Sequence, residues 1–205
     1  MKKQLIFYLI LVTNLNCGCR PVIKLIYGAK APRYETKQSL EKFHEVVFKD
    51  DHQNFAVSFD AWKNNKLFSM PEVFVFDIKG RYLPYKDSLK PNCNGPAEVF
   101  LAELDISRNY HFDSTKTLRS FVSSLETIDC EPATINLDAE TDFYIFMTWA
   151  KFTGKKIYRQ KTCQWLKALN ENKKIRFNVF YVNQDLQQCW TEEQKNYFIS
   201  DKKSE

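Results

Sequence analysis

The hydrophobic pattern of the first half of the chain alternates between short β-rich runs and segments with helical spacing. We expect strands where β-branched and aromatic residues cluster, and helices where apolar residues recur every three or four positions. These rules predict strands over residues 22–27, 55–59, 72–77 and 81–85, and helices over residues 36–48, 61–67 and 96–104. The last helix begins at a proline, which is well tolerated at a first helical position.

The pattern restarts after Asp105. A helix capped by Ser114 is predicted from apolar residues on one helical face, which are Leu118, Phe121, Val122 and Leu125. Further along, the pattern predicts strands over residues 143–149 and 175–182, a helix between them over residues 156–170, and a short last helix after the capping box of Thr191 and Gln194. The order indicates an α/β fold: a β-α-β-β-β-α core in residues 19–104, an additional C-terminal β-α-β unit in residues 105–200, and a frayed tail at residues 201–205.

The amino terminus is typical of an export signal. Two lysines precede an unbroken apolar run of eight residues from Leu5 to Val12, which is too short to span a bilayer but suits the core of a signal peptide over residues 1–18. A cysteine directly after such a core resembles the lipobox of bacterial lipoproteins. Cys19 follows the small Gly18, which favours it as the acylated residue, with Cys17 as the alternative. An ordinary cleaved signal, or a buried first strand, remains open.

A lipid on Cys19 would anchor the mature chain to a membrane without a spanning helix. We therefore expect a lipoprotein of the bacterial cell envelope, on its periplasmic side.

Composition agrees with a globular domain, since hydrophobic residues make up 44% and charged residues 27% of the 205 residues. The net charge of +5 includes no run of five basic residues, which argues against nucleic-acid binding.

The sequence contains no pattern that calls for a metal or a cofactor. None of the three histidines, His44, His52 and His111, stands at ligand spacing from a cysteine or another histidine. The acidic stretch 136–142 lacks the glycine of a calcium loop, and no phosphate-binding glycine motif is present. We therefore expect no metal and no cofactor.

The predicted order of strand, helix, strand, proline, hairpin and helix resembles the thioredoxin-like fold. Met70-Pro71 stands where that family has its cis-proline loop. Residues 143–154 are similar to the strand and active-site turn of TlpA-like periplasmic thioredoxins, and Trp149 matches the tryptophan of their W-C-x-x-C motif. The arrangement also resembles that of uncharacterised Bacteroidota lipoproteins with thioredoxin-like regions. The resemblance implies a cis peptide bond at Pro71.

The departure from the family lies in the active-site turn itself. If Trp149 aligns, the two catalytic positions are Ala150 and Thr153. Thioredoxin chemistry needs a thiolate at a helix start and a second thiol that resolves the mixed disulfide, and neither residue supplies one. We therefore expect no catalytic residue here. The chain is expected to be a redox-inactive binding or accessory module with a protein or peptide partner, because thioredoxin-like folds hold extended peptides beside the proline loop.

Four cysteines remain in the mature chain, which are Cys93, Cys130, Cys163 and Cys189. In an exported protein Cys93 and Cys130, which stand in loop-like contexts, are expected to form disulfides, whereas Cys163 and Cys189 are expected to be either small apolar residues or members of a structural disulfide. No connectivity can be deduced from the spacing. The alternative hypothesis is a divergent thiol-disulfide oxidoreductase or peroxidase that uses one of them as a displaced thiol. A third hypothesis is a structural envelope protein, which a trans Pro71 far from Trp149 and from residues 28–32 would favour.

Overall fold

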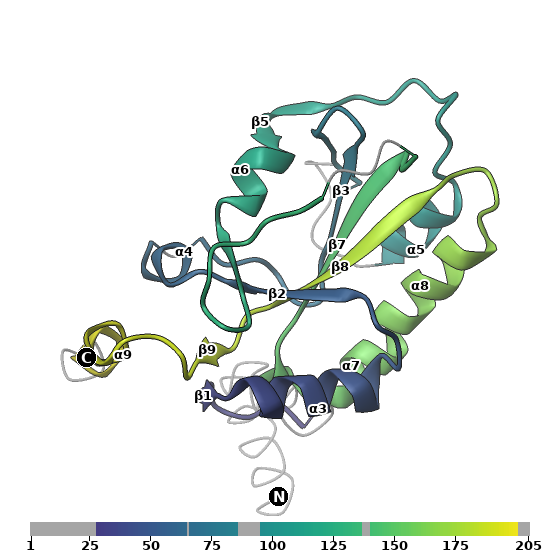
Figure 1. The fold of residues 1–205 in the computed structure, drawn as a ribbon. Helices are drawn as coiled ribbons and strands as arrows, with labels where there is room; N and C mark the ends of the chain where they lie inside the picture. The colour runs from purple at the N-terminus through teal and green to yellow at the C-terminus, as the bar shows by residue number, and fades with distance from the viewer. Residues whose placement is uncertain (1–27, 65, 86–94, 137–139, 201–205) are drawn as a thin grey trace, which may run out of the picture.

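The computed structural model describes residues 28–64, 66–85, 95–136 and 140–200. Within these ranges the chain is a mixed α/β fold, in which helices cover both faces of a central seven-stranded sheet (Figure 1). The predicted signal segment 1–18, the strand at 22–27 and the tail 201–205 lie outside the described residues, as do Cys17, Cys19 and Cys93. No helix of the described ranges is both long enough and apolar enough to cross a bilayer.

The helices of the described residues are α3 (Lys37–Val47), α4 (Phe59–Lys63), α5 (Gly95–Ala102), α6 (Leu118–Val122), the 3₁₀ turn η1 (Lys151–Thr153), α7 (Lys155–Gln160), α8 (Thr162–Glu171) and α9 (Glu192–Ser200). The strands are β1 (Tyr34–Glu35), β2 (Gln53–Val57), β3 (Val73–Asp77), β4 (Arg81–Leu83), β5 (Asp113–Thr117), β6 (Leu125–Thr127), β7 (Phe143–Trp149), β8 (Phe177–Asn183) and β9 (Leu186–Gln187).

The large sheet has the strand order β5-β4-β3-β7-β8-β2-β6. Its centre is parallel, because β7, β8 and β2 run in one direction, while β3, β4 and β5 on one side and β6 on the other are antiparallel to their neighbours. All seven residues of β7 are buried, as expected for a strand covered by helices on both faces. The helices α7 and α8 form the crossover between the parallel strands β7 and β8.

The two units predicted from the sequence share this one sheet. β7 and β8 come from residues 105–200, yet they lie between β3 and β2, which come from residues 19–104. The hairpin β3–β4 therefore pairs with the C-terminal β-α-β unit, through the register Val73 opposite Met147 and Asp77 opposite Phe143. The boundary near residue 104 does not separate two sheets.

The sheet divides the core into two layers. On one face, α3, α5, α7 and α8 pack around Leu40, Leu101, Trp149, Tyr158 and Trp165. On the other face, α4 and α6 pack around an aromatic group made of Phe55, Phe74, Phe76, Phe121, Phe146 and Phe180. Figure 1 shows that α3 and α7 lie at one end of the molecule, whereas α6 and β5 lie at the opposite end.

Three helix predictions were wrong in detail. The helix expected over residues 61–67 is α4 at Phe59–Lys63, which begins earlier because the Ser58 side chain caps it. Ser114 does not cap a helix, because residues 113–117 form the edge strand β5 and the helix α6 begins after Thr117. The capping box uses the hydroxyls of Thr117 and Ser120, which the apolar pattern alone could not locate. Leu125, which was expected on the helix, belongs to β6. The helix predicted over residues 156–170 is divided at Lys161 into α7 and α8, and nothing in the local sequence explains the break.

Candidate functional site

The turn after β7 is where the resemblance places the active site. Trp149 is fully buried and its ring stacks on Phe43 of α3, with a centroid distance of 5.4 Å and an interplanar angle of 7°. Ala150 is also buried, and η1 follows it directly. The residue at the first catalytic position is thus a core methyl group that solvent does not reach.

The backbone N–H groups at the start of η1 are taken by a carboxylate of the same chain. Asp185, 1% exposed, accepts hydrogen bonds from the backbone nitrogens of Lys151 (2.6 Å) and Phe152 (3.3 Å), and from Nδ2 of Asn183 (2.8 Å). Burial raises the pKa of Asp185, and these hydrogen bonds partly oppose the rise. A buried carboxyl group of the same chain therefore accepts the hydrogen bonds of the turn at which the resemblance would place a thiolate.

Thr153, at the second catalytic position, is held by structural hydrogen bonds. Its hydroxyl donates to the carbonyl oxygen of Ala150 (2.8 Å) and also contacts the hydroxyl of Tyr158. The Tyr158 oxygen in turn accepts from the backbone nitrogen of Ala150 (2.7 Å). Burial raises the pKa of Tyr158, so this phenol stays protonated at neutral pH. No base stands beside Thr153 among these partners, and its hydroxyl serves to fix the turn.

The segment before α3 covers the same turn from outside. The backbone nitrogen of Lys30 donates to the carbonyl oxygen of Phe152 (2.6 Å), and β1 pairs in parallel with β9. Glu35, at the end of β1, is buried and binds both Lys151 Nζ (2.6 Å) and Arg33 Nε (2.7 Å). Burial raises the pKa of Glu35, but the hydrogen bonds from Lys151, Ser39 and Arg33 outweigh it and leave the pKa below its ordinary value.

The proline loop lies directly against this turn. The Met70–Pro71 peptide bond is cis. Thr148, the residue before Trp149, forms hydrogen bonds to both sides of the loop. Its hydroxyl donates to the Ser69 carbonyl (2.8 Å) and accepts from the Glu72 nitrogen (2.8 Å). The structure therefore brings Pro71, Trp149, Ala150 and Thr153 together at one end of the sheet.

A second side chain fixes the loop at Phe68. The Gln184 side chain accepts a hydrogen bond from the Phe68 nitrogen (2.9 Å) and donates one to the Phe68 carbonyl (3.1 Å). Around the loop, the backbone of residues 68, 69 and 72 is thus hydrogen-bonded to β7 or to the residue after β8. Within the described residues, the backbone N–H and C=O of Met70 make no hydrogen bond.

The cysteines do not gather at this site. Cys130 and Cys189 form a disulfide bond between the loop after β6 and the turn before α9. Cys163 in α8 is the one free cysteine within the described ranges and is half-buried. Burial raises the pKa of its thiol, and the nearby Asp50 carboxylate raises it further. A thiol with a raised pKa is a weak nucleophile at neutral pH.

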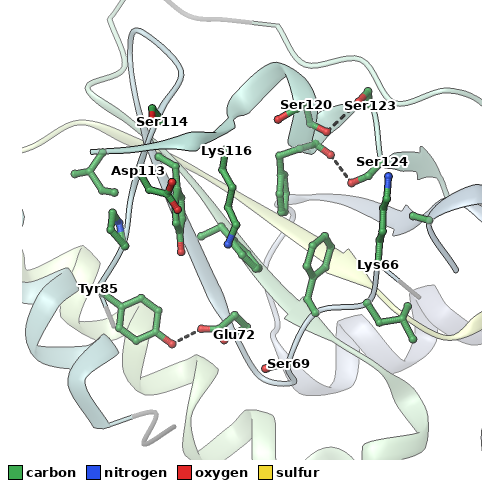
Figure 2. Close-up of a pocket in the computed structure, with 18 of the residues that line it drawn as sticks. Lys66, Ser69, Glu72, Tyr85, Asp113, Ser114, Lys116, Ser120, Ser123 and Ser124 are labelled. Atoms are coloured by element: carbon green, nitrogen blue, oxygen red, sulfur yellow. Dashed lines mark hydrogen bonds between the residues drawn. The ribbon is translucent and has the colours of Figure 1, made fainter. Parts of the chain in front are cut away.

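A wide groove opens beside the proline loop, on the α4 and α6 face of the sheet, with a volume of about 1280 Å³. Ser69 and Glu72, on either side of Met70-Pro71, belong to its wall. Figure 2 shows Lys116 of β5 reaching into the groove and Tyr85 meeting Glu72 at its base. The Lys116 ammonium lies 4.9 Å from the ring centroid of Tyr82, a cation–π contact.

The groove wall is a mixture of aromatic rings and hydroxyl groups. Its apolar part is formed by Phe68, Phe74, Tyr82 and Phe121, and its polar part by the serines at positions 58, 69, 114, 120, 123 and 124 together with Lys66 and Asp113. The sequence indicated binding beside the proline loop, but it did not indicate this wall. The alternation in the β3–β4 hairpin places Phe74 and Tyr82 on one face, but it does not reveal that α6 leaves that face partly open.

The described residues include no group of three or more histidine, cysteine or acidic side chains arranged to bind a metal ion. No protein-family model, no curated protein and no solved structure matches the chain.

Proposed function

We propose that the protein is an exported, lipid-anchored, thioredoxin-like module of the bacterial cell envelope, which does no thiol chemistry and acts by binding an extended segment of a partner protein. The observation that carries this proposal is the composition of the turn after β7. Ala150 and Thr153 stand at the two catalytic positions, and the Asp185 carboxylate already occupies the backbone N–H groups beside them.

The proposed relationship to the thioredoxin-like fold rests on spatial arrangement. A parallel β-α-β unit (β7, α7 with α8, β8) pairs with an antiparallel hairpin (β3 and β4) that follows a cis proline and precedes a helix, α5. In this chain the hairpin comes before the β-α-β unit that carries Trp149. We therefore propose a thioredoxin-like core whose two halves occur in the reverse order along the chain.

Redox inactivity follows from the absence of sulfur at this turn. A thiolate must attack the disulfide of a substrate, and a second thiol must release it. The free thiol nearest in sequence, Cys163, lies in α8 and has a raised pKa. The alternative, an oxidoreductase with a displaced cysteine, would have to use this thiol or Cys93.

Binding is proposed at the groove because its wall includes residues on both sides of Met70-Pro71, whereas the η1 turn is covered by another part of the chain. Residues 28–35 cover η1 through the bond from Lys30 to Phe152 and the pairing of β1 with β9. The groove reaches the same loop from the side of Ser69 and Glu72. An extended peptide in the groove could pair with the backbone of Met70 and place apolar side chains against Phe68 and Phe74.

The experiment measures binding of a permanently unfolded protein, reduced and carboxymethylated α-lactalbumin, to the full chain by fluorescence anisotropy. Lys116→Glu reverses a charge inside the groove, and the matched control Lys79→Glu makes the same change at an exposed turn outside it. We expect saturable binding that Lys116→Glu weakens by about tenfold or more, as for loss of a charge-assisted contact. Equal binding by both variants would place the interaction elsewhere and remove the groove from the proposal.

A further inference from the structure

The segment around α7 has an unusual charge. Residues 143–170 contain six basic residues and no acidic residue, although the whole chain has a net charge of only +5. These basic residues are Lys151, Lys155, Lys156, Arg159, Lys161 and Lys167. The mild surplus of the chain is therefore concentrated on one crossover of the sheet.

Part of this charge is exposed and forms no ion pair within the described residues. It belongs to Lys155, Lys156 and Arg159 of α7. Lys30 is exposed as well, and its backbone bond to Phe152 places it beside the start of α7. We call these four residues the basic face.

Neighbouring elements do not cancel the basic face. Lys151 and Arg33 share the buried Glu35, and the Asp185 carboxyl lies close to the same group, so these side chains neither add to the basic face nor leave a carboxylate to neutralise it. The adjacent helix α3 contacts α7, since Lys155 Nζ lies 5.8 Å from the ring centroid of Phe43. This helix also carries Glu41 and Glu45 with Lys42 on its exposed positions, so the positive surface belongs to α7 and Lys30 rather than to α3.

The charge pattern of α7 is opposite to what helix stability favours. The amino end of a helix carries a partial positive charge, which acidic side chains stabilise and basic ones destabilise by some tenths of a kcal/mol. The first turn of α7 holds Lys155 and Lys156 and no acidic residue, and Gly154 supplies no side-chain cap. Stability of α7 therefore does not account for these lysines.

The short length of chain between Cys19 and residue 28 indicates that the surface in contact with the basic face is a membrane. Nine residue steps separate Cys19 from Gly28, and an extended chain of that length reaches at most about 30 Å. A compact domain of this size is roughly 40 Å across. A lipid on Cys19 would therefore keep the end of the domain near residue 28 against the membrane, and Figure 1 shows β1, α3 and α7 together at that end.

We propose that the basic face docks on an anionic phospholipid surface and orients the anchored domain. In that orientation the part of the groove formed by α6 and β5 lies away from the bilayer, because these elements are at the opposite end of the molecule from α7 (Figure 1). This inference rests on the proposed lipid anchor for its geometry, but the electrostatic contact itself can be measured without the lipid.

The test is sedimentation with vesicles of one-third phosphatidylglycerol and two-thirds phosphatidylcholine. The full chain carries Cys17→Ser and Cys19→Ser, so that acylation is absent and the amino-terminal apolar run is common to every sample. The face variant combines Lys30→Gln, Lys155→Gln, Lys156→Gln and Arg159→Gln. The control variant makes the same number of charge removals elsewhere, with Lys79→Gln, Lys167→Gln, Lys173→Gln and Arg108→Gln. Circular dichroism verifies that both variants are folded.

Each basic side chain near an anionic membrane contributes about 1 kcal/mol, or roughly fivefold in partitioning. We expect the face variant to lose up to roughly 600-fold in vesicle binding and the control to lose much less, with neither difference seen on pure phosphatidylcholine. Equal losses in the two variants would overturn the proposal. Retention of the parent chain on heparin through the basic face, without face-dependent vesicle binding, would overturn it in favour of an acidic polymer.

These outcomes are separable from failure of the proposed function. Intact mass of the membrane-extracted chain reports acylation, and the Lys116→Glu experiment reports the groove. A chain that binds the unfolded protein but shows no face-dependent vesicle binding would refute only the docking inference.

Discussion

Glu126 provides a pH-dependent test of how the C-terminal part of the chain is held. Its side chain in β6 is buried, 8% exposed, and Oε1 accepts a hydrogen bond from Nε1 of Trp190 at 2.6 Å. Burial raises the pKa of Glu126 from 4.5 to about 7, although the bonds from Trp190 and from the Phe59 backbone act in the opposite direction. Over the pH range between these two pKa values, the folded chain therefore keeps this proton, whereas the unfolded chain has lost it.

The magnitude follows from the size of the pKa change. A pKa rise from 4.5 to about 7 corresponds to about 3 kcal/mol at 1.36 kcal/mol for each pKa unit. Because the folded state binds the proton more tightly, the Glu126 proton makes its whole contribution to the free energy of unfolding below about pH 4.5. This contribution declines as the pH rises towards 7 and is lost above that value.

The substitution Glu126→Gln removes the titration and keeps an oxygen that can accept from Trp190. We expect the variant to match the parent at pH 4.5 and to be more stable by about 2–3 kcal/mol at pH 8. Urea unfolding of the full chain under non-reducing conditions, followed by tryptophan fluorescence and far-ultraviolet circular dichroism, measures the difference. The exposed Glu131→Gln is the matched control. Parallel stability profiles for the parent and Glu126→Gln would refute the assignment of a buried, proton-holding carboxyl.

Three further predictions concern the disulfide, the free thiol and the proline loop. Replacing Cys130 and Cys189 by serine opens a link with a sequence separation of 59 and should lower the free energy of unfolding by about 4 kcal/mol, read from urea midpoints against the oxidised, disulfide-bonded parent. Cys163 should react with Ellman's reagent more slowly than free cysteine at pH 8, because its thiol pKa is raised; faster reaction would argue against a structural role. Thr148→Val should cost about 1–3 kcal/mol, because it leaves the buried Glu72 N–H without its acceptor, whereas Thr148→Ser should keep most of that stability.

The elements that the sequence predicted well are those with a strong local pattern. The β3–β4 hairpin has β-branched and aromatic runs on both sides of a glycine turn, and β7 is a short run rich in aromatic and apolar residues, which is typical of a buried strand. The capping box of Thr191 and Gln194 forms as predicted. In each case a few neighbouring residues contain the whole signal.

The order of strands could not be predicted from such patterns. Hydrophobic periodicity shows that β7 and β8 are buried, but it does not specify that they lie between β3 and β2. The strand β5 was missed for a related reason. Its residues Asp113–Thr117 are polar and mostly exposed, so the next apolar residues were assigned to one longer helix.

The candidate site was predictable in composition but not in its contacts. The sequence alone revealed that cysteine is missing at Ala150 and Thr153. It did not reveal that Asp185, more than thirty residues later, would occupy the backbone N–H groups of η1, or that residues 28–35 would cover the turn. Such contacts depend on the parallel pairing of distant strands, which brings the ends of β7 and β8 to the same edge.

The central claim, a thioredoxin-like turn without thiol chemistry, is tested most directly by insulin reduction. The full chain is assayed with dithiothreitol and compared with a reaction that contains no protein. We predict that the two rates are equal at every protein concentration. A rate that rises in proportion to the protein and is abolished by Cys163→Ser or Cys93→Ser would contradict the account.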